Sequence, residues 1–136
     1  MLYLTRRVEF CASHRLHRPE LSDDENQEIY GPCSNPGGHG HNYVLEATVR
    51  GPLDPRTGMV MNLSVLKQHL RDAIVDQVDH RHLNTDVEFL HGVIPTAENL
   101  VVAFWNLLES RLPASCSLFE LRLWETHNSM VCYRGE

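Results

Sequence analysis

An alternation of apolar and polar residues at the start of the chain limits the possible folds more than any other pattern in the sequence. Between positions 2 and 12 the apolar side chains share one parity: Leu2, Leu4, Val8, Phe10 and Ala12. Side chains of a β-strand point alternately to its two faces, so this spacing predicts a strand with one buried face. The same parity continues to His14, and the buried face is therefore expected to end in an imidazole.

Five further elements follow from patterns of the same kind. Strands are predicted over about 41–50, 117–125 and 130–134, and helices over about 62–78 and 96–111. In the first helix the apolar positions recur every three or four residues, as in an amphipathic helix: Leu63, Leu66, Leu70, Ile74 and Val78. Asn62 and Thr96 precede the two helices and are typical N-cap residues.

The order of these elements is ββααββ, which predicts an α+β fold and a single domain spanning residues 1–136. We expect a four-stranded antiparallel sheet with both helices on one face. An uncovered second face would invite burial by subunit contacts. The polar segment 15–40 is rich in Gly, Pro, Asn and Asp. It is predicted to be a long loop, and loops of that length in compact domains are usually functional.

In three of the predicted strands, ionisable residues lie at one end of the strand, on the same face as its apolar side chains. His14 continues the face of the first strand, and His39 and His41 precede the face of the second. In the third strand Glu125 follows the predicted buried set: Phe119, Leu121 and Leu123. Hairpin pairing could bring these ends together at one rim of the sheet.

The spacing of His39 and His41 indicates a metal site. Two imidazoles separated by one residue lie on the same side of a strand, and His14 can supply a third ligand from the neighbouring strand. Three histidines with an open fourth position are typical of catalytic zinc rather than structural zinc. The alternative is that His39 and His41 are solvated histidines at a strand end.

A thiol and an Asp–His pair are further candidates for chemistry. Cys33 lies in a turn-rich segment before the histidine pair, where nearby cationic charge or a metal can activate a thiolate. Asp79 directly precedes His80 and can orient its imidazole, although His82 is a rival for this role. A helix C-terminus that favours cationic residues is the alternative explanation of this cluster. The remaining cysteines are assigned no role.

Composition excludes several classes of function. The formal net charge of −6 leaves no basic stripe for nucleic acid. No stretch approaches the roughly 18 apolar residues that span a bilayer. Four widely spaced cysteines without a CxxC pair favour reduced thiols in a cytoplasmic protein.

Taken together, these residues resemble the 6-pyruvoyltetrahydropterin synthase family across essentially the whole chain. The matching segments, in order, are Phe10–Leu16, Cys33–Tyr43, Gly58–Leu63, Val78–His80, Pro95–Asn99 and Glu125–Thr126. The resemblance implies a tunnelling fold, in which subunits join into β-barrel trimers that stack as a homohexamer with active sites between subunits. It also implies that 7,8-dihydroneopterin triphosphate becomes 6-pyruvoyl-tetrahydropterin with loss of triphosphate, a step of tetrahydrobiopterin biosynthesis.

Roles for individual residues follow from the same resemblance. His14, His39 and His41 would bind Zn²⁺, and Cys33 would be the general base, supported by Asp79 and His80. Glu125 would anchor the pterin ring, with Thr96 and Glu98 lining the pocket. Arg15 and Arg81 are candidates for the triphosphate. The departures Ser34, Ala97 and His127 from the family pattern affect the detail of the pocket.

Two alternatives share this scaffold. One is the sister activity, 6-carboxy-5,6,7,8-tetrahydropterin synthase of queuosine biosynthesis, which also releases acetaldehyde, or a bifunctional enzyme. The interval between Cys33 and His39 resembles the pyruvoyl enzyme more. The other is a non-catalytic metal- or pterin-binding protein, for which removal of the Cys33 thiol would leave function intact.

Overall fold

The computed structural model describes residues 1–136. Its elements are β1 (Leu2–His14), α1 (Asp23–Tyr30), β2 (His39–Gly51), α2 (Leu63–Leu70), α3 (Asp76–Val78), β3 (Arg81–His82), α4 (Ala97–Glu109), β4 (Ser117–Thr126) and β5 (Ser129–Tyr133). A π-helical turn at Arg71–Val75 joins α2 to α3, and short 3-10 turns occupy Gly31–Ser34 and Glu88–Leu90. None of the helices combines the length and apolar character that a membrane crossing requires.

The strands form one mixed sheet in the order β3-β1-β2-β4-β5. All neighbours are antiparallel except β3, which runs parallel to β1 through Ala12 and Ser13. The prediction of a four-stranded antiparallel sheet was therefore incomplete. The missing strand has only two residues, too few to produce an alternation that a sequence pattern could reveal.

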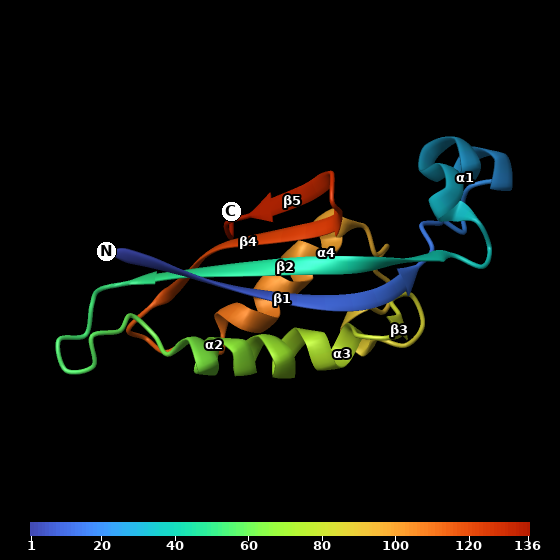
Figure 1. Cartoon of the computed structure of the whole chain (residues 1–136). Coiled ribbons are helices and arrows are strands. Elements are labelled where there is room, and N and C mark those ends of the chain that lie inside the picture. Colours follow the sequence, from blue (N-terminus) through green and yellow to red (C-terminus); the bar gives the residue numbers. More distant parts are fainter.

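The helices α2, α3 and α4 lie along one face of the sheet (Figure 1), and the apolar side chains on that face of the strands are buried against them. Phe10 of β1 meets Phe104 of α4 with ring centroids 5.9 Å apart. Burying a side chain as large as that of Phe contributes about 1.5–3 kcal/mol, and the core contains 25 apolar residues of different sizes. Helices on one face were predicted, and the sheet's opposite face is mostly polar, with Thr5 hydrogen-bonded to Thr48 across it.

The predicted helix caps are confirmed. The Asn62 side chain accepts the Ser64 N–H at 2.8 Å, and Thr96 accepts the Asn99 N–H at 3.2 Å. The first helical run covers the predicted 62–78, but Leu63 is 40% exposed and does not belong to the core. Further along the chain, the π-helical turn buries three consecutive apolar residues: Ala73, Ile74 and Val75.

Two further predicted core positions are wrong, Leu2, which is 51% exposed, and Phe119. In β4 the pairing with β2 shifts between Thr48 and Val49, so Phe119 is the extra residue of a β-bulge. A bulge reverses the alternation of side chains on either side of it. Leu118 therefore takes the core position, while the Phe119 ring lies edge-on against Tyr3 at 4.7 Å.

The predicted long loop contains a helix. Figure 1 shows α1 standing beyond the end of the sheet where β1 ends and β2 begins. Ser22 and Glu25 form a reciprocal capping box at its start. The buried Asn26 amide hydrogen-bonds to both the N–H and the C=O of Arg18. The polar composition hid this helix, because it buries almost no apolar surface and Ile29 is 60% exposed.

Candidate functional site

The register of β1 on β2 assembles the histidines. His14, the last residue of β1, is paired with His39, the first residue of β2, and Ala12 is paired with His41. The ring centroids of His14 lie 5.1 Å from those of both His39 and His41, which are 4.6 Å from each other. The predicted convergence of three imidazoles at one rim of the sheet is confirmed.

His14 is fully buried and its tautomer follows from its partner. Its Nδ1 lies 2.9 Å from the Pro95 carbonyl, which can only accept, so Nδ1 carries the proton. The lone pair then lies on Nε2, which is 3.1 Å from Nε2 of His39. Burial lowers the pKa of His14 below its usual value and keeps the ring neutral near pH 7. A neutral imidazole whose far nitrogen donates to a carbonyl is the usual state of a metal ligand.

His41 lies two residues after His39 on β2, with its ring edge-on to that of His14. Its Nε2 is buried without a hydrogen-bond partner and lies 3.5 Å from Oε1 of Glu125. Burial lowers the pKa of His41, although the Glu125 carboxylate acts against this. Glu125 is itself the extra residue of a second bulge, where β4 pairs with β5, and bulges often re-aim a side chain beside an active site.

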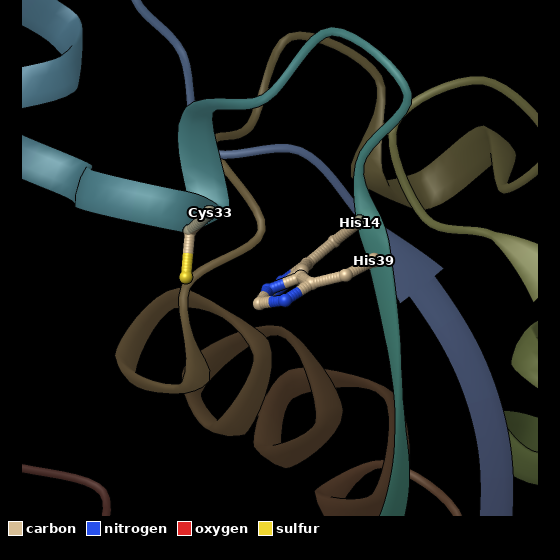
Figure 2. Close-up of side chains that lie close together, drawn as sticks. All are labelled: His14, Cys33 and His39. Atoms are coloured by element: carbon tan, nitrogen blue, oxygen red, sulfur yellow. The ribbon is translucent and has the colours of Figure 1, made fainter.

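Cys33 completes the group from the turn after α1. Figure 2 shows the rings of His14 and His39 projecting together from the adjoining strands, toward the side on which the Cys33 sulfur lies. Donor atoms of these three residues all lie within 4.8 Å of one another, as do those of His14, His41 and Glu125. Burial, and then the Glu125 carboxylate, raise the pKa of the Cys33 thiol.

Gly38 allows the close approach of the loop to β1. Its φ of +66° is a left-handed conformation, and a Cβ there would lie 2.5 Å from the carbonyl oxygen of His14. Only glycine meets both conditions without strain. The residue before His39 thus fixes the spacing between the two histidine-bearing strands.

These residues fit a metal ion. Two nitrogen ligands of a tetrahedral zinc ion are about 3.3 Å apart, close to the 3.1 Å between His14 and His39. A buried, unpartnered His41 Nε2 is otherwise costly, since a buried polar atom normally has a partner. The two overlapping groups of donor atoms are consistent with a metal site.

Asp79 and His80 lie against β1 at Cys11. Asp79 Oδ1 accepts the Cys11 N–H at 2.9 Å and lies 3.0 Å from His80 Nδ1. That amide, followed by His80, lowers the pKa of Asp79. The His80 N–H donates to the Cys11 C=O, which holds His80 at a φ of +59°. The rival His82 does not pair with Asp79, because its Nδ1 accepts the Asn84 N–H at 3.3 Å.

Asp79 and His80 share an open pocket of about 820 Å³ with His41 and Glu125, but Cys33 does not line it. One chain therefore does not gather the predicted thiol and Asp–His pair into a single cluster.

The remaining predicted residues lie near the rim. Thr96 caps α4 directly after Pro95, and Glu98 is exposed in the first turn of that helix. Arg15 is half-buried, and its Nε donates to the Ser34 carbonyl at 2.9 Å. Arg81 is exposed in β3.

Sequence reasoning gave no role to two residues that contact His14. The Pro95 carbonyl sets its tautomer, and no sequence pattern reports a backbone contact of this kind. Tyr43 is fully buried, stacks on Phe10 at 4.8 Å and places its hydroxyl 3.4 Å from His14 Nδ1. The sequence did contain a signal for Tyr43, because it lies two residues after His41 and so shares its strand face.

A family model described as 6-pyruvoyl tetrahydropterin synthase matches residues 3–136. The chain belongs to the 6-pyruvoyl tetrahydropterin synthase family. It is 51% identical over 134 residues to the 6-pyruvoyl tetrahydrobiopterin synthase of Poecilia reticulata, covering 98% of this chain and 90% of that protein. The solved structure of the Caenorhabditis elegans 6-pyruvoyl tetrahydropterin synthase matches with a TM-score of 0.91 at 39% identity, over 99% of this chain and 96% of that chain.

A member with the sister activity is more distant. The 6-carboxy-5,6,7,8-tetrahydropterin synthase of Aquifex aeolicus is 27% identical over 161 residues, covering 98% of each protein. The family resemblance read from the sequence is confirmed, and the α+β architecture is that of the synthase family.

Proposed function

We propose that this chain is a zinc-dependent lyase that converts 7,8-dihydroneopterin triphosphate to 6-pyruvoyl-tetrahydropterin and releases triphosphate. The observation that carries the proposal is the junction of His14, His39 and Cys33 at one rim of the sheet, beside His41 and Glu125. The near full-length similarity to a 6-pyruvoyl tetrahydrobiopterin synthase supports the reaction.

His14, His39 and His41 would hold the zinc ion. When bound, the ion would act as a Lewis acid toward the hydroxyl-bearing side chain of the substrate. Burial supports this assignment, since it keeps His14 and His41 neutral and their lone pairs available. The bond from His14 to Pro95 orients the first ligand before any metal arrives.

Cys33 would take the proton from the substrate, with Asp79 and His80 as its supporting pair. Burial favours the neutral thiol in the isolated chain, so a base at this position needs help from neighbouring charge. Asp79 and His80 form a ready hydrogen-bonded pair, but they line a pocket that Cys33 does not reach. We therefore assign the Asp79–His80 pair and the Cys33 thiol of each active site to different subunits.

The substrate would lie between these groups. Glu125 would anchor the pterin ring, because a carboxylate can accept paired hydrogen bonds from its N–C–N edge. Its side chain is 23% exposed, which leaves an oxygen reachable from the pocket. Thr96 and Glu98 would line the approach from α4, and Arg15 and Arg81 would lie near the triphosphate.

A homohexamer of two β-barrel trimers would supply the second subunit. The outer edge of β1 is covered by β3 only at Ala12 and Ser13, and β5 ends the sheet on the other side. Unpaired strand edges are natural pairing surfaces for another chain. Apolar residues are exposed at both edges, with Tyr3 at 56% and Met130 at 45%.

Incubation of the zinc-loaded protein with 7,8-dihydroneopterin triphosphate, with products identified by mass, tests the function. We expect triphosphate and a 6-pyruvoyl pterin, and loss of both after chelation. A 6-carboxy pterin with acetaldehyde would instead establish the sister activity, which the Aquifex relative carries by name. Unchanged substrate would refute both activities.

A further inference from the structure

Asn84, in the loop after β3, grips the backbone of the residue that follows His14. Its Oδ1 accepts the Arg15 N–H at 2.8 Å, and its Nδ2 donates to the Arg15 C=O at 2.8 Å. These two bonds satisfy both backbone groups of one residue, as a paired strand would. The side chain of Asn84 thus continues the edge contact that β3 makes with Ala12 and Ser13.

Arg15 and the residue after it are in turn hydrogen-bonded to the 3-10 segment that contains Cys33. Arg15 Nε donates to the Ser34 carbonyl at 2.9 Å, and the Leu16 N–H donates to the Cys33 carbonyl at 2.8 Å. Ser34 is only 5% exposed, so its carbonyl depends on a protein partner more than on water. The carbonyl groups of Cys33 and of the next residue, Ser34, are therefore both bonded to the two residues after His14.

The other backbone hydrogen bonds of this turn are local, such as the one from the Asn35 N–H to the Pro32 carbonyl at 3.2 Å. Gly31–Ser34 is a single 3-10 turn that begins at a glycine and a proline, and α1 on its other side projects beyond the sheet. Cys33 is nevertheless close enough to His14 and His39 for their donor atoms to fall within 4.8 Å. A chain of hydrogen bonds thus connects Asn84, through the two residues after His14, to the turn that contains Cys33.

We propose that Asn84 is a positioning residue, which acts through Arg15 to hold the Cys33 thiol against the histidine cluster. The inference rests on the proposed function, in which Cys33 is the base. It also gives Arg15 a structural task distinct from contact with triphosphate. A thiol displaced by about 1 Å would be expected to cost on the order of 10²-fold in turnover.

The test compares Asn84→Ala, Arg15→Gln and the double variant with Asn62→Ala, all as zinc-loaded protein. Asn62→Ala is the matched control, since it also removes an asparagine that bonds a backbone N–H, but at the start of α2. Two quantities are measured: the kcat and KM for 7,8-dihydroneopterin triphosphate, and the rate at which iodoacetamide alkylates Cys33, resolved by peptide mass spectrometry. Zinc content and Tm are measured alongside.

We expect both single variants to lower kcat by about 10- to 100-fold with zinc content unchanged, and Asn84→Ala to leave KM unchanged as well. Cys33 should alkylate several-fold faster in both, because the turn is released. The double variant should lose little more than either single variant, since the two residues act as one unit. Asn62→Ala should share any fall in Tm but show wild-type kcat and alkylation.

Two results would overturn the proposal: an unchanged alkylation rate in folded Asn84→Ala, or a normal kcat together with a normal alkylation rate in Arg15→Gln, which would leave Arg15 with a substrate contact alone. If Asn84→Ala does not fold, Arg15→Gln carries the test, because it keeps both Asn84 bonds. If the wild-type chain leaves the substrate unchanged, the proposed function fails, while the alkylation rates still decide whether Asn84 holds Cys33.

Discussion

His14 is the residue on which the site is organised. It is fully buried, it belongs to both groups of donor atoms, and the Pro95 carbonyl fixes its tautomer. Burial removes water from the ring and disfavours its protonated form, which lowers the pKa of His14. The same desolvation leaves a neutral nitrogen facing His39, so burial prepares the ring for a metal.

At Cys33 we predict separation of metal binding from turnover. Cys33→Ala removes the proposed base but none of the three imidazoles, so zinc content should stay unchanged while kcat falls by roughly 10²- to 10⁴-fold. Cys116→Ala is the matched control, because Cys116 is a half-buried free thiol without a place in the site. Metal analysis and product formation measure the two effects. Normal turnover in Cys33→Ala would favour a binding protein over an enzyme.

At Gly38 we predict that a single methyl group disturbs the cluster. In Gly38→Ala the new Cβ meets the His14 carbonyl oxygen, and the φ of +66° adds strain. We expect the unfolding free energy to fall by more than the roughly 1–2 kcal/mol of a left-handed alanine, with weaker zinc binding. Gly58→Ala isolates the backbone effect, since Gly58 has a φ of +71° and no atom within 4 Å. Equal losses in urea titrations of the two variants would contradict crowding at His14.

Among the elements, β1 connects most parts of the site. Its outer edge at Cys11 binds both Asp79 and His80, its next two residues pair with β3, and its end carries His14. The spacing between the Asp–His pair and the histidine cluster is therefore fixed along one strand. Strand geometry places residues three positions apart about 10 Å from each other.

At the other end of the sheet, Glu120 joins β4 to β5. This carboxylate is 4% exposed and accepts hydrogen bonds from Arg134 at 2.8–2.9 Å and from the Cys132 thiol at 3.2 Å. Burial opposes its ionisation, but these bonds outweigh burial and lower the pKa of Glu120. A depressed carboxyl pKa contributes stability above the unfolded value, and this contribution is lost as pH falls through the folded value.

We therefore predict that Glu120→Gln costs about 1–3 kcal/mol of unfolding free energy at pH 7. The gap to wild type should begin to close below about pH 4.3, the ordinary glutamate value, and disappear once the folded carboxyl is protonated. Urea unfolding of both proteins at pH 7 and at successively lower pH measures it. A gap that stays constant with pH would show that the charge of Glu120 does not matter.

The sequence was most informative where a pattern repeats. Alternation predicted β1 and β2, and because hairpin register follows from which face is buried, parity also predicted that His14 and His39 would meet. It failed where one residue breaks a pattern, as at the Phe119 bulge. It was also silent where the partner is distant: β3 is two residues long, and the Asn84 side chain bonds a backbone 69 positions away.

At the scale of the whole molecule, the isolated chain leaves two features unfinished. Both outer edges of the sheet present exposed apolar residues, and Cys33 is not gathered with Asp79 and His80. The proposed closed oligomer would answer both, because pairing at the sheet edges would bring a second copy to each active site. The proposed trimer-based assembly therefore makes a prediction that a monomeric enzyme does not.

Two inactive variants should restore activity to each other. When Cys33→Ala and His80→Ala chains are co-expressed in equal amounts, each site takes its thiol from one subunit and its imidazole from a neighbour. Random mixing leaves both groups intact in about a quarter of the sites, so turnover should recover to about a quarter of wild type. A chain carrying both substitutions, mixed with either single variant, is the control and should recover nothing. If the first mixture also stays inactive although mass analysis shows mixed oligomers, the thiol and the Asp–His pair must serve the same site from one chain. The separation of Cys33 from the pocket of His80 would then have to close by movement within the subunit.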